Sequence, residues 1–317
     1  MVIKEAAHTG ITRRGFMASA GAVLTGLETR SAAAEMVKRY HSDYFSFVGS
    51  DAAGSVYLAH DNNRGQTGEQ FFADHWIFMY ADGHGVIPLT GSAHYPNPGK
   101  VLEHIPDSEH FQFEGTLATG MRLRSASNDI DLSVEPLQPI LRRQQPSNDT
   151  WIGASAAVLR WNGRSLQGRV IFEFIARTGY NRFTSDFGSS WNNFNGLYLK
   201  GADGSDLYLR HHEKIQSDAP RDSGMSSMGG IGVLEDINFA VSESRKVDDR
   251  TYRWPESWRV EFRHLGADWR LEAKTRALEE IADWKTGGFA MSIITGHASR
   301  IDGTVTIPFQ GMAELLI

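Results

Sequence analysis

The chain has 317 residues and carries 32 Lys and Arg against 38 Asp and Glu, so its formal net charge is −6. An apolar share of 41% is too high for a disordered chain, and the acidic balance argues against a polybasic nucleic-acid binder. The absence of cysteine excludes disulfides, Cys-liganded metal sites and a cysteine nucleophile. The 32 glycines and the many aromatic residues favour short strands joined by tight turns, in one large or two medium β domains.

The first 34 residues are predicted to be an export signal. Thr12-Arg13-Arg14-Gly15-Phe16-Met17 opens a weakly apolar run that extends to Leu27, and the small residues at 31–34 suit signal-peptidase cleavage. This order resembles a twin-arginine signal, and the alternative is an ordinary amphipathic N-terminal helix. We therefore expect the twin-arginine export machinery as a partner and a periplasmic or secreted mature protein. No later stretch has the apolar length of a transmembrane helix, so an integral membrane protein is not expected.

The remaining chain shows the period-two alternation of half-buried strands. Ile130 to Glu135 and Trp258 to Arg263 place all their apolar residues on one face, and the pattern recurs around Phe111, Met121 and Val305. Asp-Gly or Asn-Gly pairs suited to hairpin turns begin at residues 82, 162, 203 and 302. An antiparallel meander is predicted, with little helix.

Two segments are exceptions to this pattern. Residues 271–284 are the one stretch considered for a short helix, beginning near Thr275. Residues 225–230, Met-Ser-Ser-Met-Gly-Gly, are interpreted as a mobile loop, because they belong to an irregular stretch rich in Gly, Ser, Asn and Asp. Composition places the boundary between two β blocks somewhere between Asp186 and Gly230.

Familiar cofactor and nucleophile motifs are missing. The chain has no GxGxxG before a helix, no GxxxxGK[ST], no GxSxG and no HExxH, so we expect no cofactor. His211-His212-Glu213 contains metal-ligating residue types, but neighbours on a strand point to opposite faces. No metal site is therefore predicted.

One polar and aromatic segment runs from Asp74 to Gly85. Its predicted strand places Asp74, Trp76, Phe78 and Tyr80 on a single face, which puts a carboxylate in line with large rings. His75 and His84 lie in the same segment. Packing in a core or at its rim is the alternative role for these rings.

A second such segment runs from Arg177 to Arg210. Tyr198 and Lys200 share the polar face of one strand, and Tyr208 and Arg210 that of the next, while leucines take the other faces. Glu173 lies between Ile171 and Ile175, and a carboxyl group in apolar surroundings has a raised pKa and can act as a general acid. The alternative for Glu173 is an ion pair with Arg160 or Arg169.

Four landmarks in this chain resemble those of two-domain lipocalin-like proteins, the family of AttH-type secreted hydrolases and carotenoid 1,2-hydratases. Residues 190–207 are similar to that family's G-W-D-W-F-x-L-x-L-x-D-G-x-x-L segment, and residues 74–78 to its E-x-W-Y-F strand. Residues 252–260 resemble its Y-P-x-x-W-x-V stretch, and residues 310–316 its closing Gly-rich strand with a Glu. The landmarks span nearly the whole mature chain in the family's order.

The resemblance implies an all-β protein made of two lipocalin-like antiparallel β-barrels or half-barrels packed side by side. After the signal at 1–34, the domains would cover 35–190 and 191–317, with a ligand cavity near their junction. The family includes hydratases that protonate an isoprenoid double bond with an acidic residue. Before Trp191 this chain keeps Asp186 but loses a basic-acidic pair that the family shows, and its Y-W-E-G-like segment is absent.

These observations predict a cofactor-independent lyase of the hydratase, dehydratase or cyclase type, acting on a small hydrophobic isoprenoid-like or aromatic molecule. A carrier that binds such a molecule unchanged is the alternative, and a hydrolase ranks last because no nucleophile with a base is visible. The predicted catalytic residues are Asp186, Asp74 and His75. The predicted ligand-binding residues are Trp76, Tyr80, His84, Glu173, Tyr180, Arg182, Trp191, Tyr198, Tyr208 and Arg210.

Overall fold

The computed structural model describes residues 36–67, 70–92, 95–96, 107–116, 119–145, 148–181, 194–212, 221–247, 250–284 and 287–317. The predicted export signal lies outside these ranges. No helix among the described residues is long and apolar enough to cross a bilayer.

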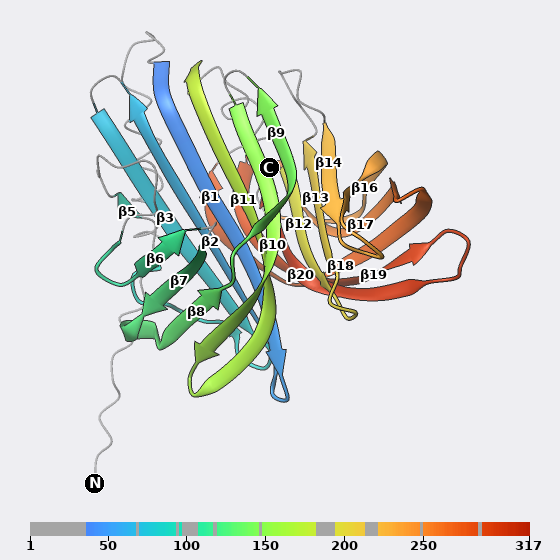
Figure 1. Ribbon diagram of the computed structural model, residues 1–317, viewed down its shortest axis with the longest axis horizontal. Coiled ribbons are helices and arrows are strands. Elements are labelled where there is room, and N and C mark those ends of the chain that lie inside the picture. Colours follow the sequence, from blue (N-terminus) through green and yellow to red (C-terminus); the bar gives the residue numbers. More distant parts are fainter. Residues whose placement is uncertain are drawn as a thin grey trace.

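The described chain forms two antiparallel sheets that lie side by side (Figure 1). The first contains β1 (Met36–Asp51), β2 (Gly54–Thr67), β3 (Gln70–Ala81), β4 (Gly85–Val86), β5 (Tyr95–Pro96), β6 (Gln112–Thr116), β7 (Gly120–Ser125), β8 (Ile130–Val134), β9 (Gln138–Gln145), β10 (Asn148–Trp161) and β11 (Arg164–Asn181). A single 3₁₀ turn, Ala126–Asn128, is the helical element of the described residues.

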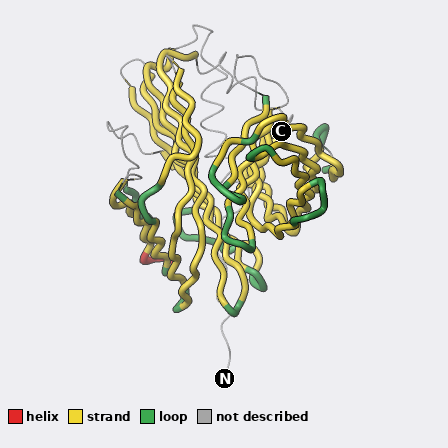
Figure 2. Tube along the Cα trace, turned by 45° about the vertical axis from the view of Figure 1, so that its right-hand side comes forward, coloured by secondary structure: helices red, strands yellow, loops and turns green. Residues whose placement is uncertain are grey.

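The second sheet contains β12 (Phe194–Gly201), β13 (Asp206–His212), β14 (Asp222–Ser226), β15 (Gly232–Val233), β16 (Glu235–Lys246), β17 (Arg253–His264), β18 (Ala267–Trp284), β19 (Gly287–Arg300) and β20 (Thr306–Leu316). Both sheets curl into half-barrels, as Figure 2 shows for the second sheet, which bends round on itself. The predicted all-β fold with two half-barrels is confirmed.

The two half-barrels follow one strand plan. The first has the order β4-β3-β2-β1-β11-β10-β8-β7-β6, and the second the order β15-β14-β13-β12-β20-β19-β18-β17-β16. In each, the first and last strands of the block pair at the centre, and the chain runs outward to one edge before returning from the other. The central strands β1 and β11 contact β12, β13 and β20 across the junction (Figure 1).

The predicted turns and alternating strands are present. Asn162 and Gly163 join β10 to β11 with φ values of 48° and 70°, the left-handed backbone that an Asn-Gly hairpin turn requires. Residues 130–134 and 258–263 lie in β8 and β17, and their apolar side chains are buried on one face. Local turn chemistry therefore accounts for much of the meander.

One local prediction is wrong, and a second is correct only in part. Residues 271–284 form most of the 18-residue strand β18 and not a helix, since β17 and β19 pair with this strand on its two sides. Bulges at Thr275/Ala277 and Glu280/Ala282 shift the alternation, which breaks the period of two in the sequence. The loop predicted at 225–230 begins two residues later than expected, because Met225 and Ser226 end β14 and Met225 is fully buried, whereas residues 227–230 form a turn outside the strands.

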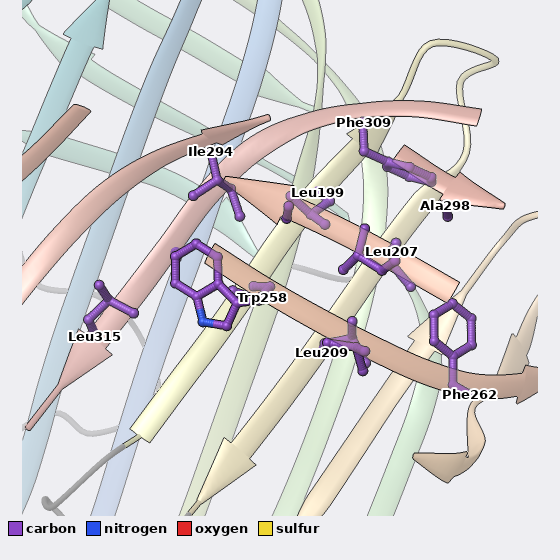
Figure 3. Close-up of a cluster of buried hydrophobic side chains, with 14 of the residues drawn as sticks. Leu199, Leu207, Leu209, Trp258, Phe262, Ile294, Ala298, Phe309 and Leu315 are labelled. Carbon is purple, nitrogen blue, oxygen red and sulfur yellow. The ribbon is translucent and has the colours of Figure 1, made fainter. Parts of the chain in front are cut away.

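Three apolar cores hold the molecule together. One fills the first half-barrel around Phe47, Leu58 and Met79, and another fills the second around Leu199, Leu209 and Trp258 (Figure 3). The third lies between the half-barrels and takes residues from both sheets. Because side chains alternate along a strand, the central strands face their own core with one set of residues and the junction with the other.

Candidate active site at the junction of the half-barrels

The junction between the half-barrels contains charged groups as well as apolar ones. Arg169 and Glu173 on β11 face the second sheet, and Asp206 and Arg210 on β13 face the first. We call the group formed by Tyr44, Glu173, Tyr198, Tyr208, Arg210 and Glu314 the junction cluster. Strands β1, β11, β12, β13 and β20 supply its members.

Glu173 is the centre of this cluster. Its carboxylate accepts hydrogen bonds from the hydroxyls of Tyr198 and Tyr208, each at 3.1 Å, and from Nη1 of Arg210 at 2.6 Å. The partner proposed from the sequence was Arg160 or Arg169, whereas the observed partner, Arg210, comes from the other half-barrel. Glu173 is buried, and so are both tyrosines. A buried carboxylate with a guanidinium and two hydroxyl donors is well compensated.

Glu314 lies beside this group without a cation of its own. Its Oε2 is 3.4 Å from the hydroxyl of Tyr198, and no ion pair of Glu314 occurs within the described ranges. Burial, followed by the negative charges of Asp61 and Glu173, raises the pKa of Glu314 well above its ordinary value, although Arg210 acts in the opposite direction. Glu314 is half-buried, and its carboxyl group therefore keeps its proton to a higher pH than an ordinary glutamate does.

The two carboxyl groups share one phenol. Tyr198 has a single hydroxyl proton and can donate it to only one acceptor at a time. Burial, and then the charge of Glu173, raise the pKa of Tyr198 well above its usual range, so the phenol keeps its proton. When Tyr198 donates to Glu173, its oxygen is free to accept from a protonated Glu314.

Aromatic rings surround the two acids. The ring centroids of Tyr44 and Tyr198 are 4.6 Å apart, and those of Tyr44 and Trp76 are 6.4 Å apart. Trp76 packs edge-on against Phe289 at 4.9 Å. The hydroxyl of Tyr44 is buried and has no hydrogen-bond partner in the described part of the chain. Burial, and then the charges of Glu314, Asp61 and Glu173, raise the pKa of Tyr44, which leaves its hydroxyl as a donor.

A second ion pair crosses the junction. Nε of Arg169 lies 3.1 Å from Oδ1 of Asp206, and Nη2 of the same guanidinium binds Oδ2. Asp206 is completely buried, and burial raises its pKa while Arg169 lowers it. On the same face, the hydroxyl of Tyr57 and Oε1 of Gln310 are 3.2 Å apart. These contacts fix the half-barrels against each other.

The structure brings together four of the residues predicted to bind a ligand: Glu173, Tyr198, Tyr208 and Arg210. Trp76 joins them through Tyr44. Tyr80 lies further along the same face of β3, where its ring meets Tyr57 at 5.9 Å. His84 lies in the turn after β3 with its ring 6.3 Å from Trp161, away from the junction cluster.

The structure describes the predicted catalytic residues only through their backbone or not at all. The backbone of Asp74 and His75 lies in β3, opposite Asn63 and Asn62 of β2, and that of Tyr180 lies in β11. The side chains of these three residues are not described. Asp186, Arg182 and Trp191 lie outside the described ranges.

Sequence reasoning missed Glu314 and Tyr44 as site residues. Glu314 belongs to the Gly-rich closing strand that was used as a landmark, and it interrupts an otherwise apolar run from Gly311 to Ile317. Tyr44 stands between Asp43 and Phe45 and gives no such signal.

Other polar features lie outside the junction. His211 bonds Asp222 through Nδ1 at 2.6 Å, whereas His212 accepts from Nε of Arg210 at 2.6 Å, so the neighbouring histidines have separate partners. No group of three metal-ligating side chains occurs among the described residues. A surface hollow of about 470 Å³ lies beside Asp131 and Arg160, which pair with each other at 3.8 Å.

No model of a known protein family matches the chain, and no curated protein matches it. Solved structures do share its fold. Kievitone hydratase from Nectria haematococca has a TM-score of 0.56 at 9% identity, covering 87% of this chain and 88% of that one. A protein assigned as AttH from Nitrosomonas europaea has a TM-score of 0.56 at 10% identity, covering 88% and 92%. CghA with Sch210972 has a TM-score of 0.51 at 10% identity, covering 88% of each chain.

The chain has the fold of AttH and kievitone hydratase. The resemblance drawn from the four sequence landmarks is confirmed at this level. At 9 to 10% identity the likeness establishes the architecture and leaves the chemistry to the residues of the junction.

Proposed function

We propose that the protein is a cofactor-independent lyase that adds water to, or removes it from, a small hydrophobic isoprenoid-like or aromatic molecule at the junction of its half-barrels. Glu314 is the general acid in this proposal. The observation that carries it is a carboxyl group without a cation of its own, 3.4 Å from the Tyr198 hydroxyl, next to a second carboxylate that pairs with Arg210. Burial raises the pKa of the Glu314 carboxyl. A carboxyl group with a raised pKa next to an ion-paired carboxylate is a typical arrangement in acid–base sites.

The reaction begins with proton transfer from Glu314 to one carbon of a double bond. The π electrons form the new C–H bond, and the adjacent carbon becomes a cation. The faces of Tyr44, Tyr198 and Trp76 stabilise such a charge through their ring quadrupoles. Water then attacks the cation, and the proton that it loses returns to the Glu314 carboxylate. Dehydration is the same sequence in reverse.

Tyr44 orients an oxygen atom in this scheme. Its hydroxyl has no partner among the described residues and is close enough to Glu314 and Glu173 to feel their charges. A buried donor without a partner is costly, and a substrate oxygen or the attacking water would satisfy it. Tyr44 is therefore the residue that places the oxygen near the cation.

A carrier with no chemistry is the second candidate, since an apolar junction also suits binding alone. An unpaired acid is unnecessary for carriage and would weaken the binding of an apolar ligand. Glu314 has no basic partner in the described structure, and this favours catalysis over carriage. Asp186 and Asp74 remain acids proposed from the sequence and are tested beside Glu314.

The test uses the purified protein with a panel of terpenoid and prenylated aromatic alkenes in H₂¹⁸O, and mass spectrometry detects hydration. For a converted alkene, Glu314→Gln should reduce the rate by about 10² to 10⁴, the usual contribution of a general acid. Glu280→Gln is the matched control, because Glu280 accepts from Trp254 outside the junction at 3.1 Å and a glutamine can do the same.

Three outcomes contradict parts of the proposal. Full activity of Glu314→Gln would show that another residue is the general acid, and Asp186→Asn and Asp74→Asn would then identify it. A rate that does not fall as pH rises through the raised pKa of Glu314 would also exclude this acid. Recovery of a co-purified apolar compound unchanged, with no alkene converted, would favour the carrier.

We also propose export through the twin-arginine pathway, on the strength of Arg13-Arg14 and the weakly apolar run that follows. Cell fractionation of the full chain should place it outside the cytoplasm. Replacing both arginines with lysine should retain it inside, and unchanged localisation would exclude this route.

A further inference from the structure

A second polar group lies inside the first half-barrel, on the opposite face of the sheet from the junction cluster. Asp43 on β1 and Asn62 and Arg64 on β2 form this group, which we call the inner cluster. Asp43 pairs directly with Asn62 across the two strands, and Arg64 lies two residues further along β2. By alternation these positions share the concave face with Phe45 of the apolar core.

The inner cluster is buried and incompletely paired. Asn62 is 0% exposed and Arg64 is 1% exposed. Nη2 of Arg64 binds Oδ2 of Asp43, but Nε and Nη1 have no hydrogen-bond partner, and neither have Oδ1 and Nδ2 of Asn62, among the described residues. Buried polar groups almost always have partners, so four such atoms on adjacent side chains need an explanation.

The unpaired atoms define the chemistry of a complementary ligand. Nε and Nη1 of Arg64 and Nδ2 of Asn62 are donors, and Oδ1 of Asn62 is an acceptor. The charge of Arg64 is already balanced by Asp43, so an added anion would face the carboxylate of Asp43 in a buried setting. A neutral group that joins a carbonyl oxygen to an adjacent N–H or O–H fits this arrangement.

Aromatic rings lie next to the inner cluster. The ring of His60, between the inner cluster and the apolar core, lies 5.1 Å from Phe45 and 4.8 Å from Phe113. Trp151 and Phe174 form a second pair with centroids 5.2 Å apart, and Phe174 is opposite Asp43 in the register of β1 and β11. A planar apolar body attached to the polar group would therefore find matching surface.

Strand β6 covers His60 from the edge of the first sheet. It has five residues at the edge of the first sheet, and all except Phe113 are exposed. The ring of Phe113 lies 4.8 Å from the ring of His60, so rotation of the Phe113 ring would uncover His60. The hydrogen bond from the Phe113 amide to Asp107 and the ion pair between Arg124 and Glu114 keep the strand in place.

We infer that the inner cluster is a ligand site, separate from the junction, for a small neutral molecule that carries an amide-like or hydroxycarbonyl group on an aromatic or apolar body. Arg64 and Asn62 bind the carbonyl oxygen, and Oδ1 of Asn62 accepts from the adjacent donor. The ring of Phe113 moves aside as the ligand binds.

The test is an NMR titration of the full chain with three probes of similar size: benzamide, benzoate and ethylbenzene. Benzamide should bind at least tenfold more tightly than the other two. Asn62→Leu should weaken benzamide binding at least tenfold and leave ethylbenzene unaffected, and Phe113→Ala should speed benzamide association by removing the cover.

Asn195→Leu is the matched control. Asn195 is a buried asparagine of the second half-barrel whose Oδ1 accepts from Nε1 of Trp258 at 3.0 Å. It should leave benzamide binding unchanged and lower the melting temperature, whereas Asn62→Leu should raise it, because only Asn195 loses a satisfied bond.

Four results would overturn the inference. These are the absence of benzamide binding at tens of millimolar, equal binding of ethylbenzene, tighter binding of benzoate, and benzamide binding that Asn62→Leu does not change. None of them depends on Glu314, so the inner cluster is tested independently of the proposed catalytic activity.

Discussion

Removal of Arg169 is expected to destabilise the protein strongly, because it leaves a buried carboxylate without its cation. Asp206 is 0% exposed; its backbone N–H donates to the hydroxyl of Ser227, and its carbonyl oxygen accepts from the hydroxyl of Ser226. Breaking a buried pair from one side costs about 3–5 kcal/mol. Lys200 also lowers the pKa of Asp206 and so compensates part of its charge, which places the expected cost near about 3 kcal/mol.

The assay is urea unfolding of Arg169→Met followed by circular dichroism at several pH values. In the variant, burial of Asp206 is no longer opposed by Arg169, so the folded-state pKa rises further above the unfolded value of 3.8. A raised pKa in the folded state means that stability falls as pH increases, so the defect should be larger at pH 8 than at pH 5.

A double variant separates charge burial from loss of packing. Replacing both partners, as Arg169→Met with Asp206→Leu, should recover most of the lost stability, because well-packed apolar residues can substitute for a buried pair. A cost below about 1 kcal/mol for Arg169→Met, or a double variant no more stable than the single one, would refute the reasoning.

Two further predictions concern β20. The stability of the protein should fall as pH rises above about 4.5, the ordinary pKa of the Glu314 carboxyl, because the folded state keeps this proton to a higher pH than the unfolded state. In urea unfolding at several pH values, Glu314→Gln should therefore reduce the dependence of stability on pH. An unchanged pH dependence would show that Glu314 does not cause it. Gly311→Ala should cost about 1–3 kcal/mol in the same assay, since its Cβ would lie 1.9 Å from the carbonyl oxygen of Tyr198; unchanged stability would show that β12 can move away.

Much of the fold was predictable because the relevant forces act locally. Asn162-Gly163 specifies its turn through the backbone of two residues, and alternation in β8 and β17 specifies which side chains are buried. Strand β18 was misread because its bulges interrupt the alternation, and only its pairing with β17 and β19 shows it to be a strand. The pairing of segments that are distant in the chain cannot be predicted from the sequence of either segment alone.

The same distinction explains the candidate site. Glu173, Tyr198, Tyr208 and Arg210 each interrupt an apolar pattern on their own strand, so their sequence surroundings mark them as unusual. Their convergence on one carboxylate depends on how two separate sheets pack. Glu314 shares Tyr198 with Glu173 but lies 116 residues from Tyr198 along the chain, and no spacing rule connects them.

The two ion pairs of the junction also restrict how strands β11 and β13, and with them the two half-barrels, can align. Along β11 a cation at Arg169 is followed four residues later by an anion at Glu173, and along β13 an anion at Asp206 is followed four residues later by a cation at Arg210. Sliding one strand by four residues would set Arg169 against Arg210 or Glu173 against Asp206. Reversing one strand would create both repulsions at once. Two half-barrels with the same strand plan therefore have one electrostatically matched alignment, and that alignment places Arg210 beside Glu173.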